Sequence, residues 1–195
     1  MYEPDNIFFD FCKRWYDKSK SYSIDFDTLD DTEKLKRVFD QFFSFWVLYN
    51  CLYNEFCDTS TSDRTKAIDG VFDLIHANIN NEQKQTIIVL CTKIKSIKTV
   101  CRLNFYSNRS LSSNVIRRRQ RNSSTRRTLP AERVSCKFFN DEQLIQGLDN
   151  SDINEKLQAA LVALYQIRCN LFHGDKSFTN NQINVLKPLI ELLEK

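Results

Sequence analysis

The chain has 195 residues, enough for one domain with a substantial core, and its net charge is only +3. It contains three glycines and three prolines, too few for the turns that an all-β chain of this length needs. The composition therefore favours helices and excludes a polycation, so any attraction to nucleic acid has to come from a local patch.

The first two predicted helices are rich in aromatic residues. A short helix is predicted over 6–18, and Asp30, Asp31 and Thr32 are candidate N-cap residues for the next one. The second helix carries an aromatic stripe at alternating steps of three and four: Phe39, Phe42, Trp46, Tyr49, Tyr53 and Phe56. Packing in the hydrophobic core explains such a stripe better than a binding site in which aromatic side chains surround a cofactor.

Two further helices are predicted before residue 102. The first covers 64–79, and Gly70 within it would permit the close approach of another helix. Its predicted buried residues are Ala67, Ile68, Val71, Phe72 and Ile75. The second covers 82–101 and directs Ile87, Leu90, Ile94 and Ile97 inward.

A basic segment over 106–135 interrupts the helical pattern. It is rich in Ser and Arg, and no acidic residue precedes Glu132 in it, so we expect a flexible loop or arm. Six arginines are candidates for contacts with RNA phosphates: Arg117, Arg118, Arg119, Arg121, Arg126 and Arg127. A disordered insertion that keeps itself solvated explains the same composition equally well.

Helices resume after this segment. A short amphipathic helix is predicted over 141–148, and Ser151 or Asp152 then opens a strongly apolar helix that Gly174 closes. The last helix runs over 180–193 and is interrupted or kinked at Pro188. The prediction is a single all-α domain over 1–195, with about six helices and one long Ser/Arg-rich internal loop.

Several classes of site and location are not supported by the sequence. Two histidines and dispersed cysteines give no zinc spacing, and no glycine-rich phosphate loop occurs, so we expect neither a metal nor a cofactor. Without a signal sequence or a long apolar run, a cytoplasmic protein without membrane contact is expected. The seven cysteines, with no CxxC pair, are predicted to be reduced and mostly buried: Cys12, Cys51, Cys57, Cys91, Cys101, Cys136 and Cys169.

One residue breaks the pattern of the apolar helix. Leu157, Leu161, Leu164, Arg168 and Leu171 follow one another at steps of four, three, four and three, so Arg168 takes a position reserved for an apolar side chain. Because burial of an unpaired charge costs several kcal/mol, this arginine must be paired, face a cleft or face a partner subunit.

His173 ends the same helix, and Asn170 lies three residues before it, on the same face. A purely structural explanation remains open, in which the helix dipole favours His173 and Arg168 holds a buried carboxylate. The only other histidine, His76, lies in a separate apolar helix and is predicted to be structural.

The segment LYQIRCNLFHGDK resembles the signature helix of the HEPN superfamily, in which four to six residues separate an arginine from a histidine. Here four residues separate Arg168 from His173, and Asn170 is the polar residue between them. The segment FFSFWVLYNCLYNEF is also similar to the HEPN helix that packs against that signature. Together the two segments cover about a seventh of the chain.

This resemblance implies a helical bundle that forms a homodimer and cleaves RNA without a metal. Arg168 would then hold the scissile phosphate, His173 would transfer protons, and Asn170 would orient groups. Asn50 and Asn54, one turn apart on the aromatic helix, would support the site.

The leading hypothesis is an RNA endonuclease, a toxin or antiviral defence effector, with an antitoxin or sensor as a possible partner. It would cleave by attack of the RNA 2′-hydroxyl, and a dimer would supply the second histidine that general acid and base catalysis need. The alternative is a catalytically inactive HEPN module for dimerisation or nucleic-acid binding.

Overall fold

The structure is a computed structural model that describes residues 6–23, 26–57, 61–101, 140–172 and 181–194. Within these ranges it contains helices and no strand, which confirms the predicted all-α class. The elements are α1 (Asn6–Ser21), η1 (Phe26–Thr28), α2 (Asp31–Phe56), α3 (Asp63–Thr65), η2 (Lys66–Gly70), α4 (Val71–Ile75), η3 (His76–Asn78), α5 (Asn81–Cys101), α7 (Asp141–Asp149), α8 (Ile153–Phe172) and α9 (Asn181–Glu194). None of the described helices combines the length and the apolar character that a membrane span requires.

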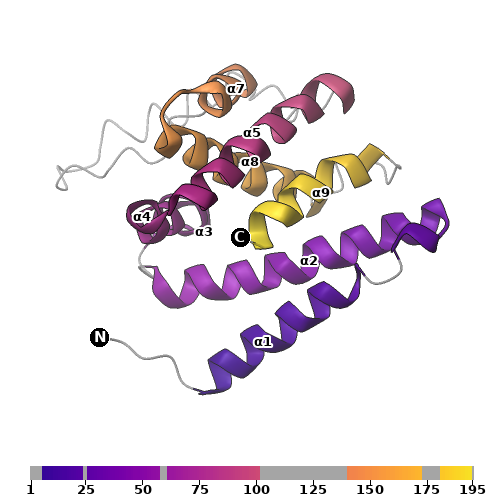
Figure 1. The fold of residues 1–195 in the computed structure, drawn as a ribbon. Coiled ribbons are helices and arrows are strands. Elements are labelled where there is room, and N and C mark those ends of the chain that lie inside the picture. The colour runs from indigo at the N-terminus through magenta and orange to yellow at the C-terminus, as the bar shows by residue number, and fades with distance from the viewer. Residues whose placement is uncertain (1–5, 24–25, 58–60, 102–139, 173–180, 195) are drawn as a thin grey trace, which may run out of the picture.

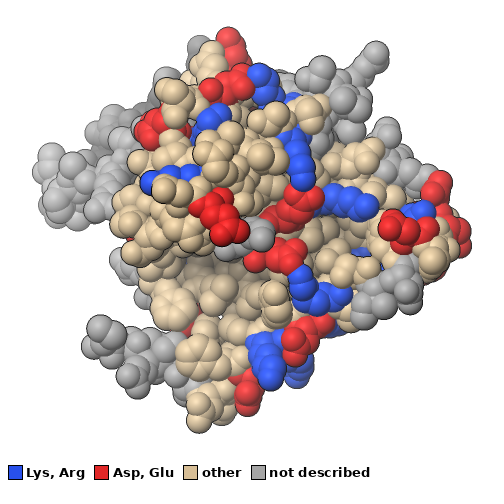
Figure 2. Space-filling view, in the orientation of Figure 1, with Lys and Arg blue, Asp and Glu red and all other residues tan. Residues whose placement is uncertain are grey.

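The helices α1 and α2 form an antiparallel pair along one side of the bundle (Figure 1). α9 packs against both α2 and α5, while α8 packs against α5 and α7. Two ion pairs join α9 to its neighbours: Lys20 of α1 pairs with Glu194, and Lys93 of α5 lies 2.5 Å from Glu191. On the face drawn in Figure 2, basic and acidic side chains are interspersed.

The aromatic stripe of α2 contributes to the core over most of its length. Phe42, Trp46 and Tyr53 are buried, as predicted. Phe56 is 45% exposed, so the prediction that the whole stripe is buried is wrong at its last member. α2 ends at Phe56, where the ring has an edge-on contact with Phe8 of α1 and otherwise borders an open pocket.

The helix predicted over 64–79 is present as a continuous helical run over 63–78, which consists of α3, the π-helical turn η2, α4 and the 3-10 turn η3. Gly70 ends the π-helical turn, and a Cβ atom at this position would lie 2.6 Å from Sγ of Cys57. The close approach predicted for Gly70 is therefore confirmed. Ile75, predicted to be buried, is 38% exposed because it lies at the same pocket as Phe56.

The helix α8 crosses the centre of the core, and most of its residues from Leu157 to Ile167 are buried. Asp152 precedes it, and its side chain accepts a hydrogen bond of 3.0 Å from the backbone N of Asn154. The described part of α8 ends at Phe172, so the predicted stop at Gly174 lies outside the described residues. α9 continues through Pro188 instead of being interrupted there.

Candidate functional site

The guanidinium group of Arg168 lies among aromatic rings in the last turns of α8. Its Cζ atom is 5.1 Å from the ring centroid of Trp46 on α2, and 5.9 Å and 4.8 Å from those of Tyr165 and Phe172 on α8. A cation at such distances from an aromatic ring is attracted by the negative face of the ring. Arg168, which occupies an apolar position of the sequence pattern, is therefore stabilised by cation–π contacts.

None of the ion pairs found among the described residues involves Arg168. Its Nη1 atom lies 3.9 Å from Sγ of Cys169, a weak contact, and its buried Nε has no hydrogen-bond partner in the described part of the chain. A buried carboxylate partner, the structural explanation left open by the sequence, is therefore not found among these residues.

A hydrogen-bonded network that the sequence did not predict lies beside Arg168. The carboxylate of Asp63 accepts a hydrogen bond of 2.7 Å from Oη of Tyr53 and one of 3.1 Å from Oη of Tyr165. Asn50 in turn donates from Nδ2 to Oη of Tyr53. The network joins α2, α3 and α8 at the place where Arg168 stacks.

Burial and then the contact with Asp63 raise the pKa of Tyr53, while Asn50 and Arg168 act in the opposite direction. Burial also raises the pKa of Tyr165, as do Cys169 and Asp63, and Arg168 again opposes the shift. Both phenols therefore keep their protons near neutral pH and act as hydrogen-bond donors to Asp63.

A second cation approaches the network. The Cζ atom of Arg64 lies 5.8 Å from the ring centroid of Tyr165, so two guanidinium groups approach this ring. Ser62, which caps α3 through a 3.2 Å hydrogen bond with the backbone N of Thr65, fixes the turn that carries Asp63 and Arg64.

The three asparagines predicted for the site have different surroundings in the structure. Asn50 belongs to the network described above. Asn54 is exposed: its Nδ2 donates to the backbone O of Asn50 at 2.9 Å, and its Oδ1 accepts from Nζ of Lys66 at 3.0 Å. Asn170 is only 5% exposed, and its Oδ1 accepts a 3.4 Å hydrogen bond from Gln166. Because residues two apart on a helix are separated by about 200°, Asn170 and Arg168 do not share a face.

The remaining predicted site residues lie outside the described residues. These are His173 and the arginines of the basic segment, namely Arg117, Arg118, Arg119, Arg121, Arg126 and Arg127. The other histidine, His76, stacks on the ring of Phe72 with a centroid distance of 4.7 Å and places Nδ1 2.9 Å from the backbone O of Phe72. These local contacts support its predicted structural role.

An apolar edge adjoins the Arg168 cluster. The rings of Phe43 and Phe172 lie 5.5 Å apart, and the two side chains are among the exposed large apolar residues. The guanidinium group of Arg168 is therefore bordered by an exposed aromatic pair on one side and by the polar network on the other.

The described cysteines differ from the prediction in their burial. Five of them are free thiols, but only Cys91 is buried, whereas Cys12, Cys51, Cys57 and Cys169 are half-buried. The prediction of mostly buried thiols is therefore wrong for this set. Burial raises the pKa of the Cys91 thiol to about 12.

Sequence reasoning identified Arg168 and Asn50 but missed Asp63, Tyr53 as a hydrogen-bond donor, and Tyr165. The spacing of Tyr165 and Arg168, three residues apart on one helix, was the available signal for their contact.

Searches for a matching family model, a curated relative or a similar solved structure found none.

Proposed function

We propose that the protein is a metal-independent RNA endonuclease of the HEPN type, in which Arg168 contacts the scissile phosphate. The observation that carries this proposal is the guanidinium group of Arg168, which has aromatic neighbours but no carboxylate partner in the described ranges. No acidic side chain of the described residues forms an ion pair with this charge.

A guanidinium group held in this way suits phosphate recognition. Its planar N–H donors match two phosphate oxygens, and charge-assisted hydrogen bonds of this kind are stronger than neutral ones. Stacking on Trp46 and Phe172 limits the orientations that the side chain of Arg168 can adopt. The positive charge would also stabilise the negative charge that builds on the phosphate in the transition state.

The reaction would be an internal transesterification. The RNA 2′-oxygen attacks phosphorus, the bond from phosphorus to the 5′-oxygen breaks, and the products carry a cyclic phosphate and a 5′-hydroxyl. One histidine would take the proton of the 2′-hydroxyl, and a second would give a proton to the departing 5′-oxygen. His173 and its copy in a homodimer would fill these two roles near neutral pH.

The exposed rings of Phe43 and Phe172 support the proposed dimer, because an apolar edge beside Arg168 would be covered when two copies meet there. The arginines of 106–135 would draw RNA toward the cleft. Asn50 would act through Tyr53, and the buried Asn170 would hold the end of α8 instead of contacting RNA. In this proposal the protein is a toxin or defence effector restrained by an antitoxin or sensor.

One observation favours the alternative, an inactive HEPN module for dimerisation or nucleic-acid binding. Asp63, an exposed carboxylate, belongs to the network beside Arg168 and would repel a phosphate group. In that case Arg168 has a structural role in joining α8 to α2, and nucleic-acid affinity comes from the basic segment.

The two candidates are separated by incubating purified protein with total RNA and with transfer RNA in excess EDTA, followed by mapping of the product ends. Wild type and His76→Ala should give cyclic-phosphate ends, while His173→Ala and Arg168→Ala should not. His76→Ala is the matched control, since the hydrogen bond and the ring contact found for His76 are both with Phe72, one turn earlier in the chain. RNA that is bound but left intact by every variant would refute cleavage and support the binding module.

A further inference from the structure

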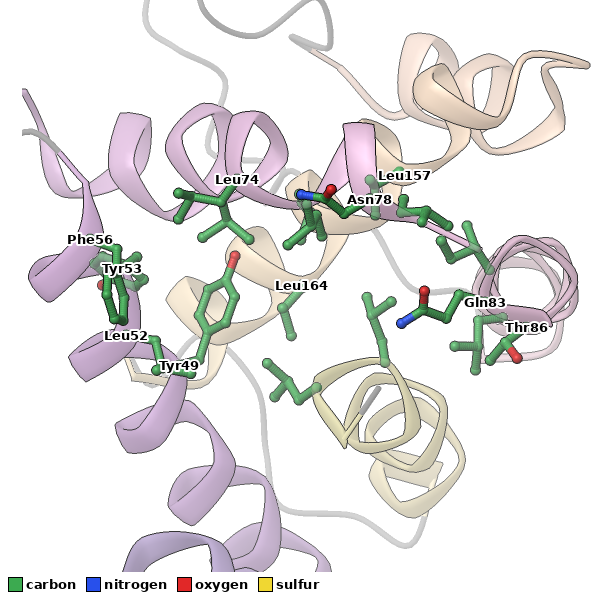
Figure 3. Close-up of a pocket in the computed structure, with 18 residues that line it drawn as sticks. Tyr49, Leu52, Tyr53, Phe56, Leu74, Asn78, Gln83, Thr86, Leu157 and Leu164 are labelled. Atoms are coloured by element: carbon green, nitrogen blue, oxygen red, sulfur yellow. The ribbon is translucent and has the colours of Figure 1, made fainter. Parts of the chain in front are cut away.

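An apolar pocket of about 440 Å³ opens between α2, α4, η3, α5, α8 and α9 (Figure 3). None of its lining side chains belongs to Lys, Arg, Asp or Glu. Pockets of about 300–1,000 Å³ with mostly apolar walls are the usual size for small-molecule sites. The inference for this pocket does not rest on the proposed nuclease chemistry, although Tyr53 belongs both to the pocket lining and to the network beside Arg168.

The mouth of the pocket gathers exposed apolar side chains. Among the large apolar residues that are exposed in the described structure, Leu52 and Phe56 of α2 and Leu74 and Ile75 of α4 all line this pocket. Their exposed fractions are 38–45%. On the face in Figure 2 the surface between α4 and the end of α2 is hollowed and mostly uncharged. Apolar exposure concentrated at one concavity is typical of a binding site.

The floor of the pocket lies deep in the core. Leu90 of α5 and Leu157 and Leu164 of α8 line it, and each is at most 2% exposed. A groove that receives a helix from a partner would be shallow and long, whereas this pocket reaches the central helix of the bundle. A cavity with such walls excludes water, which cannot recover its hydrogen bonds there.

The polar part of the lining consists of two neutral amides, Asn78 and Gln83, and of hydroxyl groups that already donate to protein oxygens, those of Tyr49, Tyr53 and Thr86 (Figure 3). Gln83 accepts a 3.0 Å hydrogen bond from the backbone N of Asn80 through Oε1, which leaves its Nε2 as a donor. Asn78 is exposed at the pocket, and no hydrogen bond of its side chain is found among the described residues. The pocket therefore offers neutral hydrogen-bonding groups and no charge to pair with an ionised ligand.

We infer that this pocket binds an uncharged, largely apolar small molecule with one oxygen acceptor, such as a medium-chain alcohol or ester. A cavity of about 150 Å³ accommodates benzene, so this one has room for roughly three times as many atoms. The acceptor oxygen would meet the amide of Asn78 or Gln83, and the apolar body would contact Leu157 and Leu164. A carboxylate or phosphate head would lose its hydration without meeting a cation.

The test uses the neutral dye N-phenyl-1-naphthylamine, whose fluorescence rises in apolar surroundings. The full chain is titrated with the dye, which is then displaced with decan-1-ol or, at pH 8, with decanoate. We expect one saturable site per chain, displacement by decan-1-ol, and displacement by decanoate that needs about tenfold more ligand or more.

Paired variants locate the site. Ile75→Glu places a carboxylate at the mouth of the pocket and should weaken dye binding about tenfold or more. Val89→Glu is the matched control, because Val89 is also an exposed apolar residue, 53% exposed, but does not line the pocket. Asn78→Ala should weaken the binding of decan-1-ol about threefold to tenfold, the value of one hydrogen bond, and leave dye binding unchanged.

Circular dichroism melts of each variant identify any that fail to fold, and Asn78→Ala, at an exposed position, removes one polar group of the lining while its apolar wall stays unchanged. The inference is overturned by dye binding that does not saturate, by equal affinity in Ile75→Glu and Val89→Glu, or by equal displacement by decanoate. Sedimentation that shows a dimer in wild type and a monomer in Ile75→Glu would also overturn it, because a second copy would then occupy the pocket.

Discussion

Removal of the Asp63 carboxylate tests whether the network beside Arg168 stabilises the fold. In Asp63→Ala, the hydroxyl of Tyr53 loses its acceptor, and Tyr53 is 0% exposed in the native structure. The loss of a hydrogen bond from a buried hydroxyl costs about 1–2 kcal/mol. The bond from Tyr165 reaches an exposed carboxylate and adds about 0.5 kcal/mol. We expect the free energy of unfolding to fall by about 2 kcal/mol in total.

Urea denaturation followed by circular dichroism measures this loss, and a decrease of about 4–8 °C in the melting temperature should accompany it. Asp10→Ala is the control, since Asp10 is an exposed aspartate of α1, and its effect should be below about 0.5 kcal/mol. A double-mutant cycle with Tyr53→Phe should give a coupling energy of about 1 kcal/mol with Asp63. A change below 0.5 kcal/mol in Asp63→Ala, or a coupling energy near zero, would refute the proposed stabilisation.

Three further predictions follow from other contacts. Gly70→Ala should lower the free energy of unfolding by about 1–3 kcal/mol in urea denaturation, because its Cβ would lie 2.6 Å from Sγ of Cys57. Asp30→Ala should lower it by about 1 kcal/mol in the same assay, since the side chain caps the backbone N of Glu33. The raised pKa of Cys91 makes the native state hold a proton that the unfolded chain loses, so stability should fall as pH rises from about 9 to 12. Urea midpoints at a series of pH values measure this slope, which should be shallower in Cys91→Ala.

Each of these has a result that would contradict it. The effect of Gly70→Ala should shrink in a Cys57→Ala background, and an unchanged effect would exclude the close contact as its cause. Equal stability of Asp30→Ala and wild type would show that the capping bond contributes nothing. Because tyrosines also lose protons in alkaline solution, the comparison with Cys91→Ala is decisive, and identical slopes would exclude this thiol.

The helices could be predicted from sequence where local pattern determines them. The aromatic repeat of α2 and the leucine repeat of α8 each specify one apolar face, and the structure buries three of the six aromatic residues and three of the four leucines. Residues 63–78 also form the helix that was predicted there, and they differ from a regular α-helix in the π-helical turn and the final 3-10 turn. Gly70 packs against Cys57, and the chain accommodates this approach with a π-helical turn that no periodicity indicates.

The candidate site could be predicted only in part, for a related reason. Arg168 interrupts an apolar repeat and is therefore visible in the sequence alone. Asp63 meets Tyr53 and Tyr165, which are 10 and 102 residues away along the chain, so no local spacing reports these contacts. Among the aromatic partners of Arg168, Trp46 was assigned to core packing from the sequence, and it also contacts the cation.

The residue Tyr53 connects the Arg168 cluster with the apolar pocket, since its hydroxyl binds Asp63 and its side chain lines the pocket. Asp63 and the pocket residue Leu74 belong to the same run of short helices, α3 to α4, which Gly70 holds against Cys57. A ligand that moves α4 away from α2 would therefore stretch the bond between Tyr53 and Asp63. By reciprocity, loss of that bond should change ligand affinity. The dye titration measures this coupling in Asp63→Asn, where a change of at least about threefold from wild type is expected, and equal affinities would show that the two sites are independent.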